Sequence, residues 1–186
     1  QHGGDADARP EVPLVGGDKI GPRPVNFHVE ALQKMGAIIE ETSEGYHATA
    51  PNGLRGALIE LPYPSVGATE TALLAGVLAK GRTMIRNAAG EPEIKELIMM
   101  LQNMGAIIQI NSGRSIEIIG VEKLHGTTAR VMPDRIEAAS YGAMAIGTAG
   151  EIFVRGAQHA QMMTFLNAVR KIGAEYEVRE DGILFR

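Results

Sequence analysis

The chain has 186 residues, of which 45% are hydrophobic and 22% charged, which suits a soluble globular protein with one large core or two small ones. It has no cysteine, which excludes disulfides and thiolate chemistry, while a net charge of −4 with 4% aromatic residues argues against nucleic-acid binding. We find no apolar run of roughly 18 residues and no signal peptide, and therefore expect a cytoplasmic protein without a membrane contact.

An internal repeat organises the chain. The segments LQKMGAIIEE, LQNMGAIIQI and VRKIGAEYEV resemble one another, and their glycines, Gly36, Gly105 and Gly173, recur after about 70 residues. Each segment predicts a helix that ends at a glycine in the left-handed conformation, followed by a strand and a hairpin turn.

The predicted elements follow the repeat in chain order. The first unit has a strand at 11–15, a helix at about 25–35 and strands at 37–41 and 46–49. The middle unit has strands at 57–61, 83–87, 106–110 and 115–119, with helices at about 66–79 and 92–104. The last unit has strands at 129–132, 151–155, 174–178 and 182–185, with helices at about 135–148 and 161–172.

The fold class is therefore α/β (α+β), with β-α-β-α-β-β units. The first unit lacks the opening strand and helix, so we expect a piece of a longer repeat protein or one that another chain completes. A stable α/β scaffold with no further role is the alternative that the repeat alone leaves open.

Four strand-to-helix connections hold the candidate functional residues, because the N–H groups and the dipole at a helix N-terminus favour an anion. They are GGDKIGPRPVN with Asp18, Lys19 and Arg23, PYPSVGATET with Ser65 and Gly67, AAGEPEI with Glu91 and Glu93, and MPDRIEA with Asp134 and Arg135.

Each connection also has a purely structural interpretation. Helix capping is the favoured interpretation of Ser65, Glu91, Glu93 and Asp134 when no other information is used, and a surface ion pair accounts for Arg135. Asp18 and Arg23 fit that interpretation less well, because their glycine- and proline-rich loop gives them no helical neighbour. The five histidines show no metal-ligand spacing, and His28 is expected to be packed or exposed without a catalytic role.

The motifs GGDKIGPRPVNFH, PSVGATET, NAAGEPEI and MPDRIEA, in this order, resemble the UDP-N-acetylglucosamine enolpyruvyl transferase family from about Val12 to Arg186. The resemblance implies two domains, each an inside-out α/β prism of three such units. It makes the chain a central portion of the enzyme: residues 1–10 a disordered or non-native leader, 11–130 the first domain with a partial and a full repeat, and 131–186 the first repeat of the second domain.

The resemblance also implies an activity. It is the transfer of the enolpyruvyl group of phosphoenolpyruvate to the 3-hydroxyl of UDP-N-acetylglucosamine with release of phosphate, the first committed step of peptidoglycan synthesis, on which cell-wall biogenesis, cell shape and cell division depend. No cofactor or metal is implied, and the partners are the two substrates and the remaining segments of the same enzyme. A non-catalytic nucleotide- or anion-binding module, a structural α/β protein and a transferase similar to enolpyruvylshikimate phosphate synthase stay open as alternatives.

The site residues follow from the same resemblance. Asp18 stands where the family carries a proton-donating cysteine, which makes Asp18 the general acid and predicts insensitivity to fosfomycin, an epoxide that alkylates that cysteine. Arg23 is implied to be catalytic as well, facing phosphoenolpyruvate. The implied substrate-binding residues are Arg23, Pro24, Val25, Asn26 and Phe27 for the nucleotide sugar, Tyr63, Pro64, Ser65, Val66 and Gly67 for the uridine diphosphate, and Glu91 and Arg135 near the cleft. Asn26 and Tyr63 replace an aspartate and a lysine that are common in the family.

Overall fold

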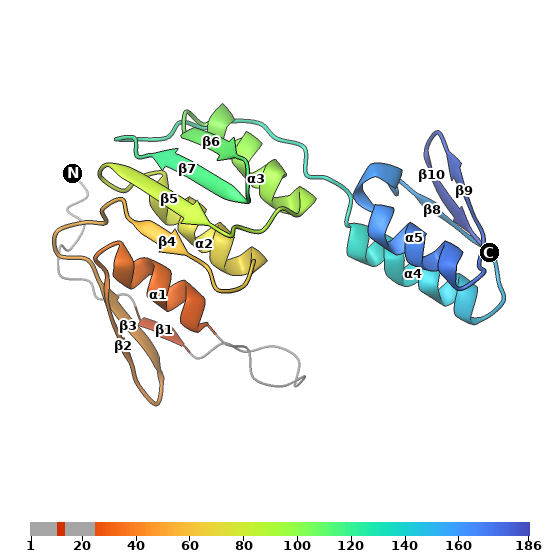
Figure 1. The fold of residues 1–186 in the computed structure, drawn as a ribbon, viewed down its shortest axis with the longest axis horizontal. Helices are drawn as coiled ribbons and strands as arrows, with labels where there is room; N and C mark the ends of the chain where they lie inside the picture. Colours follow the sequence, from red (N-terminus) through yellow and green to blue (C-terminus); the bar gives the residue numbers. More distant parts are fainter. Residues whose placement is uncertain (1–10, 14–24) are drawn as a thin grey trace. The chain divides into compact units, whose positions relative to one another are not determined.

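The structure, a computed structural model, describes residues 11–13 and 25–186. The chain forms two compact units, Gln1–Ala129 and Arg130–Arg186 (Figure 1). None of the helices in the described residues is long and apolar enough to cross a membrane.

The helices and strands lie close to the predicted ranges. The first unit contains β1 (Glu11–Pro13), α1 (Asn26–Lys34), β2 (Ile38–Glu41), β3 (Gly45–Thr49), β4 (Leu58–Glu60), α2 (Val66–Gly76), β5 (Arg82–Arg86), α3 (Pro92–Asn103), β6 (Ile107–Asn111) and β7 (Ser115–Ile119). The second unit contains α4 (Arg135–Gly147), β8 (Ile152–Arg155), a 3₁₀ turn (His159–Gln161), α5 (Met163–Lys171), β9 (Tyr176–Arg179) and β10 (Gly182–Phe185). Helix α2 ends at Gly76 rather than at the predicted residue 79.

The sheets confirm the repeat. Their strand orders are β1-β3-β2, β4-β5-β7-β6 and β8-β10-β9. In each sheet the first strand of the C-terminal hairpin (β2, β6 or β9) lies at the edge, and the second strand (β3, β7 or β10) lies inside the sheet next to it. Strand β4 pairs with β5 in parallel, as a strand-helix-strand crossover requires, and the other pairs are antiparallel. The middle unit is therefore β-α-β-α-β-β, as predicted.

The prediction of a strand at 129–132 is wrong. These residues form neither helix nor strand, and Val131 is 86% exposed. The equivalent strand of the middle unit, β4, is held by a ladder to β5, whereas β8 pairs only with β10 among the described strands. An extended pattern without a hydrogen-bonding partner does not become a strand, and this segment instead spans the junction between the two units.

Three helices end in the same way, at the glycines that mark the repeat. Gly36, Gly105 and Gly173 have φ angles of +97°, +99° and +82°. At the first of them, the amide of Gly36 donates to the carbonyl of Gln33 and the next amide donates to the carbonyl of Leu32, and both bonds recur at the other two. This is the Schellman pattern, in which a residue with a Cβ would be strained, so local chemistry turns each helix into its strand.

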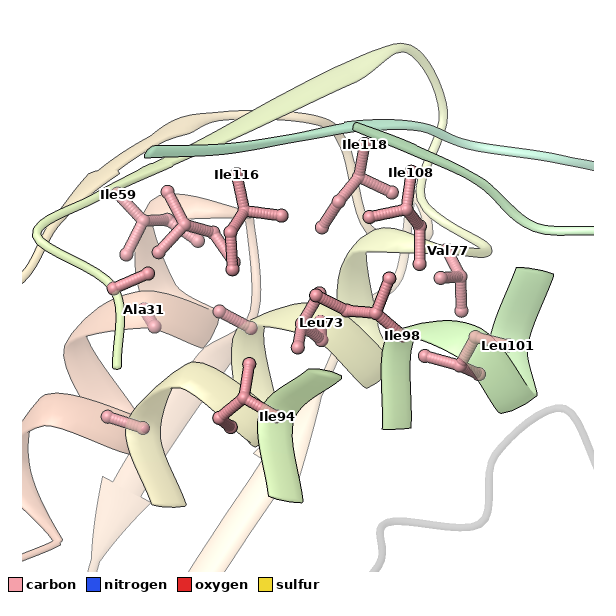
Figure 2. Close-up of a cluster of buried hydrophobic side chains, with 14 of the residues drawn as sticks. Ala31, Ile59, Leu73, Val77, Ile94, Ile98, Leu101, Ile108, Ile116 and Ile118 are labelled. Carbon is pink, nitrogen blue, oxygen red and sulfur yellow. The ribbon is translucent and has the colours of Figure 1, made fainter. Parts of the chain in front are cut away.

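The core of the first unit lies between the β4–β7 sheet and helices α2 and α3, which cover one of its faces (Figure 1). Alternate strand residues point into it and meet the buried faces of the two helices (Figure 2); among them are Ile59, Ile116, Ile118, Leu73, Ile94 and Ile98. Each such side chain contributes roughly 1.5–3 kcal/mol when buried. This packing fixes the position of the N-terminus of α2, where several candidate residues lie.

The second unit has its own core. Phe185 and Ile183 of β10 are fully buried against Leu166 of α5. Phe165 packs edge-to-face on Phe185, with ring centroids 5.9 Å apart. This core supports α4, whose N-terminus holds Asp134 and Arg135.

Candidate functional site

Helix α1 begins with three residues that the family resemblance assigns to the nucleotide-sugar site. Val25 is the N-cap and is half-buried, Asn26 is exposed, and Phe27 packs against the core of the first unit. The first turn carries no acidic side chain, so no carboxylate of that turn offsets the positive end of the helix dipole. Asp18, Arg23 and Pro24 lie outside the described residues.

A groove of about 500 Å³ lies beside α1 and has Val25 and Asn26 in its wall. Its other polar lining includes Glu30, Glu41 and Tyr46. The Tyr46 hydroxyl donates to Glu41 over 3.5 Å, and desolvation, followed by the charge and hydrogen bonding of Glu41, raises the pKa of the phenol above its ordinary value. Two carboxylates make this side of α1 acidic, so an anionic ligand fits the helix N-terminus better than the groove.

Helix α2 begins with the segment that the resemblance assigns to a diphosphate. Ser65 is its N-cap, and the Ser65 Oγ accepts from the amide of Ala68 over 3.3 Å. Its first turn also lacks acidic residues. The residues from Pro64 to Gly67 are half-buried, whereas Tyr63 is 64% exposed. Capping therefore uses the Ser65 hydroxyl, while the first amides of the helix still have no carbonyl within the helix to bond.

The N-terminal parts of α1 and α2 lie against each other. The His28 Nδ1 is within 2.8 Å of the Thr71 Oγ1 in a hydrogen bond. The same imidazole covers Gly67, where an added Cβ would lie 3.0 Å from His28 Cε1. Glycine at this position lets the two helices approach. The fold thus brings together two candidate segments, 25–27 and 63–67, that are about 40 residues apart in the sequence.

The connection from β5 to α3 is attached to the same place. Ala89 donates its amide to the Thr69 Oγ1 on α2 over 3.0 Å, and two residues later Glu91 becomes the N-cap of α3. The side chain of Glu91 makes no capping hydrogen bond. Capping therefore accounts for Ser65 but not for Glu91, which leaves the half-buried Glu91 carboxylate available to a ligand.

Arg135 belongs to the second unit and stands at the first position of α4. The carboxylate of Asp134 caps this helix, accepting from the amides of Ile136 and Glu137 over 2.8 and 3.0 Å. A groove of about 360 Å³ contains Asp134, Arg135 and Tyr141 in its wall. Asp134 thus caps helix α4, as its position in the sequence allows. Arg135 lies in the wall of a groove that has room for a ligand.

Metal binding finds no support in the described part of the chain, where no three His, Asp or Glu side chains gather closely enough to hold an ion. The features that favour an anion are instead the N-termini of α1 and α2, and Glu91 follows two residues after Ala89, which bonds to α2.

The comparison with known proteins identifies the family. The sequence profile of EPSP synthase (3-phosphoshikimate 1-carboxyvinyltransferase) matches residues 4–185. The chain belongs to the EPSP synthase family. The resemblance drawn from the four motifs is thereby confirmed at the level of the family, and so is the α/β fold class.

Within the EPSP synthase family, curated relatives share about half of the sequence. The UDP-N-acetylglucosamine 1-carboxyvinyltransferase of Protochlamydia amoebophila is 53% identical over 178 residues, which cover 94% of this chain and 38% of that protein. The protein of the same name from Chlamydia trachomatis serovar D is 51% identical over 174 residues, 94% of this chain and 39% of its own. The chain spans about two fifths of the length of these relatives.

A solved structure shows the EPSP synthase family fold. The enolpyruvyl transferase NikO from Streptomyces tendae superposes with a TM-score of 0.76, at 20% identity, over 89% of this chain and 42% of that one. At this identity the likeness concerns the fold alone, and it agrees with the repeated units described above.

Two residues that hold the site together carry no signal in the sequence. His28 was expected to be packed or exposed, and it is indeed packed, but its bond to Thr71 spans 43 positions. Thr69 lies inside the motif PSVGATET, yet its bond to Ala89 spans 20 positions. Such partners depend on how α1, α2 and α3 pack, so no local pattern predicts them.

Proposed function

We propose that this chain is part of an enzyme that transfers the enolpyruvyl group of phosphoenolpyruvate to the 3-hydroxyl of UDP-N-acetylglucosamine. Two relatives named UDP-N-acetylglucosamine 1-carboxyvinyltransferase, 53% and 51% identical to this chain, support the choice of UDP-N-acetylglucosamine as the acceptor. The observation that carries the site is the contact between the N-terminal parts of α1 and α2, which gathers the segments 25–27 and 63–67. Because the chain spans 38–39% of those relatives, the activity is assigned to the complete protein.

The diphosphate of the nucleotide sugar would bind at the N-terminus of α2. Amides of the first turn of a helix point along its axis without an intrahelical partner, and the dipole favours negative charge there. Gly67 would allow the diphosphate to approach the backbone closely. The neighbouring residues Tyr63, Pro64, Ser65 and Val66 would complete the diphosphate site. Arg23, Pro24, Val25, Asn26 and Phe27 would line the sugar side, and Glu91 and Arg135 would each contribute to substrate binding from its own unit.

The chemistry is an addition followed by an elimination. The 3-hydroxyl gives up its proton to a base and its oxygen bonds to C2 of phosphoenolpyruvate, while C3 gains a proton from an acid, which gives a tetrahedral intermediate. C3 then loses a proton, the double bond re-forms, and the C2–O bond to phosphate breaks. No external oxidant or reductant is needed, and none of these steps calls for a metal or cofactor.

Asp18 would be the acid that protonates C3, and Arg23 would face the phosphoenolpyruvate anion. A free aspartic acid has a pKa of about 3.9, so the proposal requires an environment that raises this value. Substrate phosphates and exclusion of water would raise the pKa of Asp18, whereas Lys19 and Arg23 would lower it. An aspartic acid keeps a proton donor in place of the family's thiol.

The proposal has consequences for the organisation and setting of the protein. Residues 11–130 would belong to the first domain and 131–186 to the second, with the remaining segments of the enzyme completing both. The reaction would take place in the cytoplasm and supply peptidoglycan synthesis, and through it cell-wall biogenesis, cell shape and division.

A phosphate-release assay on the complete gene product tests the proposal. With phosphoenolpyruvate and UDP-N-acetylglucosamine we expect phosphate and enolpyruvyl-UDP-N-acetylglucosamine in equal amounts. Shikimate 3-phosphate serves as the competing acceptor, because the family profile is that of 3-phosphoshikimate 1-carboxyvinyltransferase. Turnover with shikimate 3-phosphate alone would refute the proposed acceptor, and binding of the nucleotide sugar without phosphate release would refute the activity.

A further inference from the structure

Two buried threonines of the first unit differ in how their hydroxyls are used. Thr69 and Thr83 are both 0% exposed. The Thr69 Oγ1 donates to the carbonyl of Ser65 over 2.7 Å and accepts from the amide of Ala89 over 3.0 Å. The Thr83 Oγ1 has no hydrogen-bond partner among the described residues. A buried hydroxyl is costly unless it is bonded, and only at Thr69 is that cost offset.

The bonds of Thr69 join two connections that carry candidate residues. Ser65 caps α2 in the connection that follows β4, and Ala89 lies in the connection that follows β5 and leads to Glu91. Because β4 and β5 are parallel neighbours, both connections leave the same edge of the sheet. The Thr69 hydroxyl is therefore a buried link between the diphosphate segment and the loop before Glu91.

Asn87 adds a second link between the same connections. Its Nδ2 donates to the carbonyl of Leu61 over 2.8 Å, and its φ of +54° places it in the left-handed region, which asparagine tolerates better than most residues. The chain thus turns at Asn87 and is fastened at both Asn87 and Ala89 before it reaches Glu91.

We propose that Thr69 is a positioning residue that holds the Glu91 connection in register with the N-terminus of α2, with Asn87 as its auxiliary. The inference rests on the proposed function, which assigns Ser65 and Glu91 to the substrate. Without the Thr69 hydroxyl, the buried amide of Ala89 loses its acceptor and the carbonyl of Ser65 loses its side-chain donor. Both connections then shift, and the diphosphate segment, residues 63–67, shifts with them.

Three threonine variants of the complete gene product test this role. Thr69→Val keeps the shape and removes both bonds, Thr69→Ser keeps the hydroxyl, and Thr83→Val removes a hydroxyl that has no hydrogen-bond partner in the described part of the chain. For Thr69→Val we expect KM for UDP-N-acetylglucosamine to rise about tenfold, within the range for a buried amide left unpaired, with KM for phosphoenolpyruvate nearly unchanged. Thr69→Ser and Thr83→Val should behave like the wild type.

The KM values separate positioning from mere loss of stability. A partly unfolded population lowers the apparent kcat and leaves both KM values as they were. A Thr69→Val protein with a wild-type KM for UDP-N-acetylglucosamine, or equal effects in Thr83→Val, would overturn the positioning role. If Thr69→Val does not fold, Asn87→Gly replaces it, because glycine accepts the φ of +54° and removes only the side-chain link; an unchanged KM there would also contradict the proposal.

Amide hydrogen exchange keeps this inference distinct from the proposed function. The amide of Ala89 should exchange faster in Thr69→Val but not in Thr69→Ser or Thr83→Val, whether or not the protein turns over. A wild-type protein that releases no phosphate would refute the proposed function, and the exchange rates would then decide alone whether Thr69 holds the connection. Unchanged exchange at Ala89 would show that it does not.

Discussion

The hydrogen bond between His28 Nδ1 and Thr71 Oγ1, 2.8 Å long, ties the first turn of α1 to α2. The imidazole lies over Gly67 at the same time. Two helix N-termini from different repeats thereby become one surface, although neither repeat contains both. The candidate site is a product of this contact.

Removal of the His28–Thr71 bond should weaken both stability and nucleotide-sugar binding. In a double-mutant cycle of His28→Ala and Thr71→Val, we expect a coupling free energy of about 0.5–1.5 kcal/mol in chemical denaturation, the usual net value of one hydrogen bond. Calorimetry with UDP-N-acetylglucosamine should show weaker binding in both single variants. Additive effects on stability would mean that the bond contributes nothing in solution.

Gly67 should not tolerate a methyl group. In Gly67→Ala the new Cβ would lie 3.0 Å from His28 Cε1, so the imidazole must move by a few tenths of an ångström, which we expect to strain its bond to Thr71. We expect a lower thermal midpoint and weaker nucleotide-sugar binding. Gly147→Ala is the matched control, since this helical glycine has nothing within 4 Å of an added Cβ, and alanine favours a helix by up to about 1 kcal/mol. Equal stability losses in the two variants would contradict this account.

The three N-caps Ser65, Glu91 and Asp134 should respond differently to substitution. Ser65→Ala and Asp134→Ala lose capping bonds and should each cost about 0.5–2 kcal/mol of unfolding free energy. Glu91→Gln removes no capping bond, so its unfolding free energy should change by less than about 0.5 kcal/mol while turnover falls. A destabilised Glu91→Gln protein with full activity would make Glu91 a structural residue.

Asp18→Asn should abolish phosphate release and leave nucleotide-sugar binding intact. Asparagine has nearly the same shape as aspartic acid but cannot donate a proton to C3 of phosphoenolpyruvate. Single-turnover kinetics and calorimetry measure the two properties separately. Full turnover in Asp18→Asn would remove Asp18 from the mechanism.

Fosfomycin should leave the protein unmodified. The chain contains no cysteine, and a carboxylate is a weaker nucleophile towards an epoxide than a thiolate. Intact-mass spectrometry after prolonged incubation should show the unmodified mass, and phosphate release should continue at its original rate. A stoichiometric adduct on Asp18 would disprove the prediction.

Much of the fold could be predicted because the signals are local. The helices that end at Gly36, Gly105 and Gly173 do so through bonds from the amides of the glycine and of the next residue to carbonyls only three and five positions earlier. The strand predicted at 129–132 fails for the opposite reason, because a strand exists only with a partner, and the described partner of β8 is β10 alone.

The same distinction applies to the site. The residue types, their motifs and the helix N-termini on which they stand can be identified along the chain, since caps, glycines and charges act within one turn. Whether the hydroxyl of a buried threonine links two segments depends on packing: Thr69 bonds to Ser65 and Ala89, whereas the equally buried Thr83 has no partner among the residues that the structure describes. Tertiary structure decided these roles because hydrogen bonds act over about 3 Å, and only the folded chain brings residues 20 or 43 positions apart within that range.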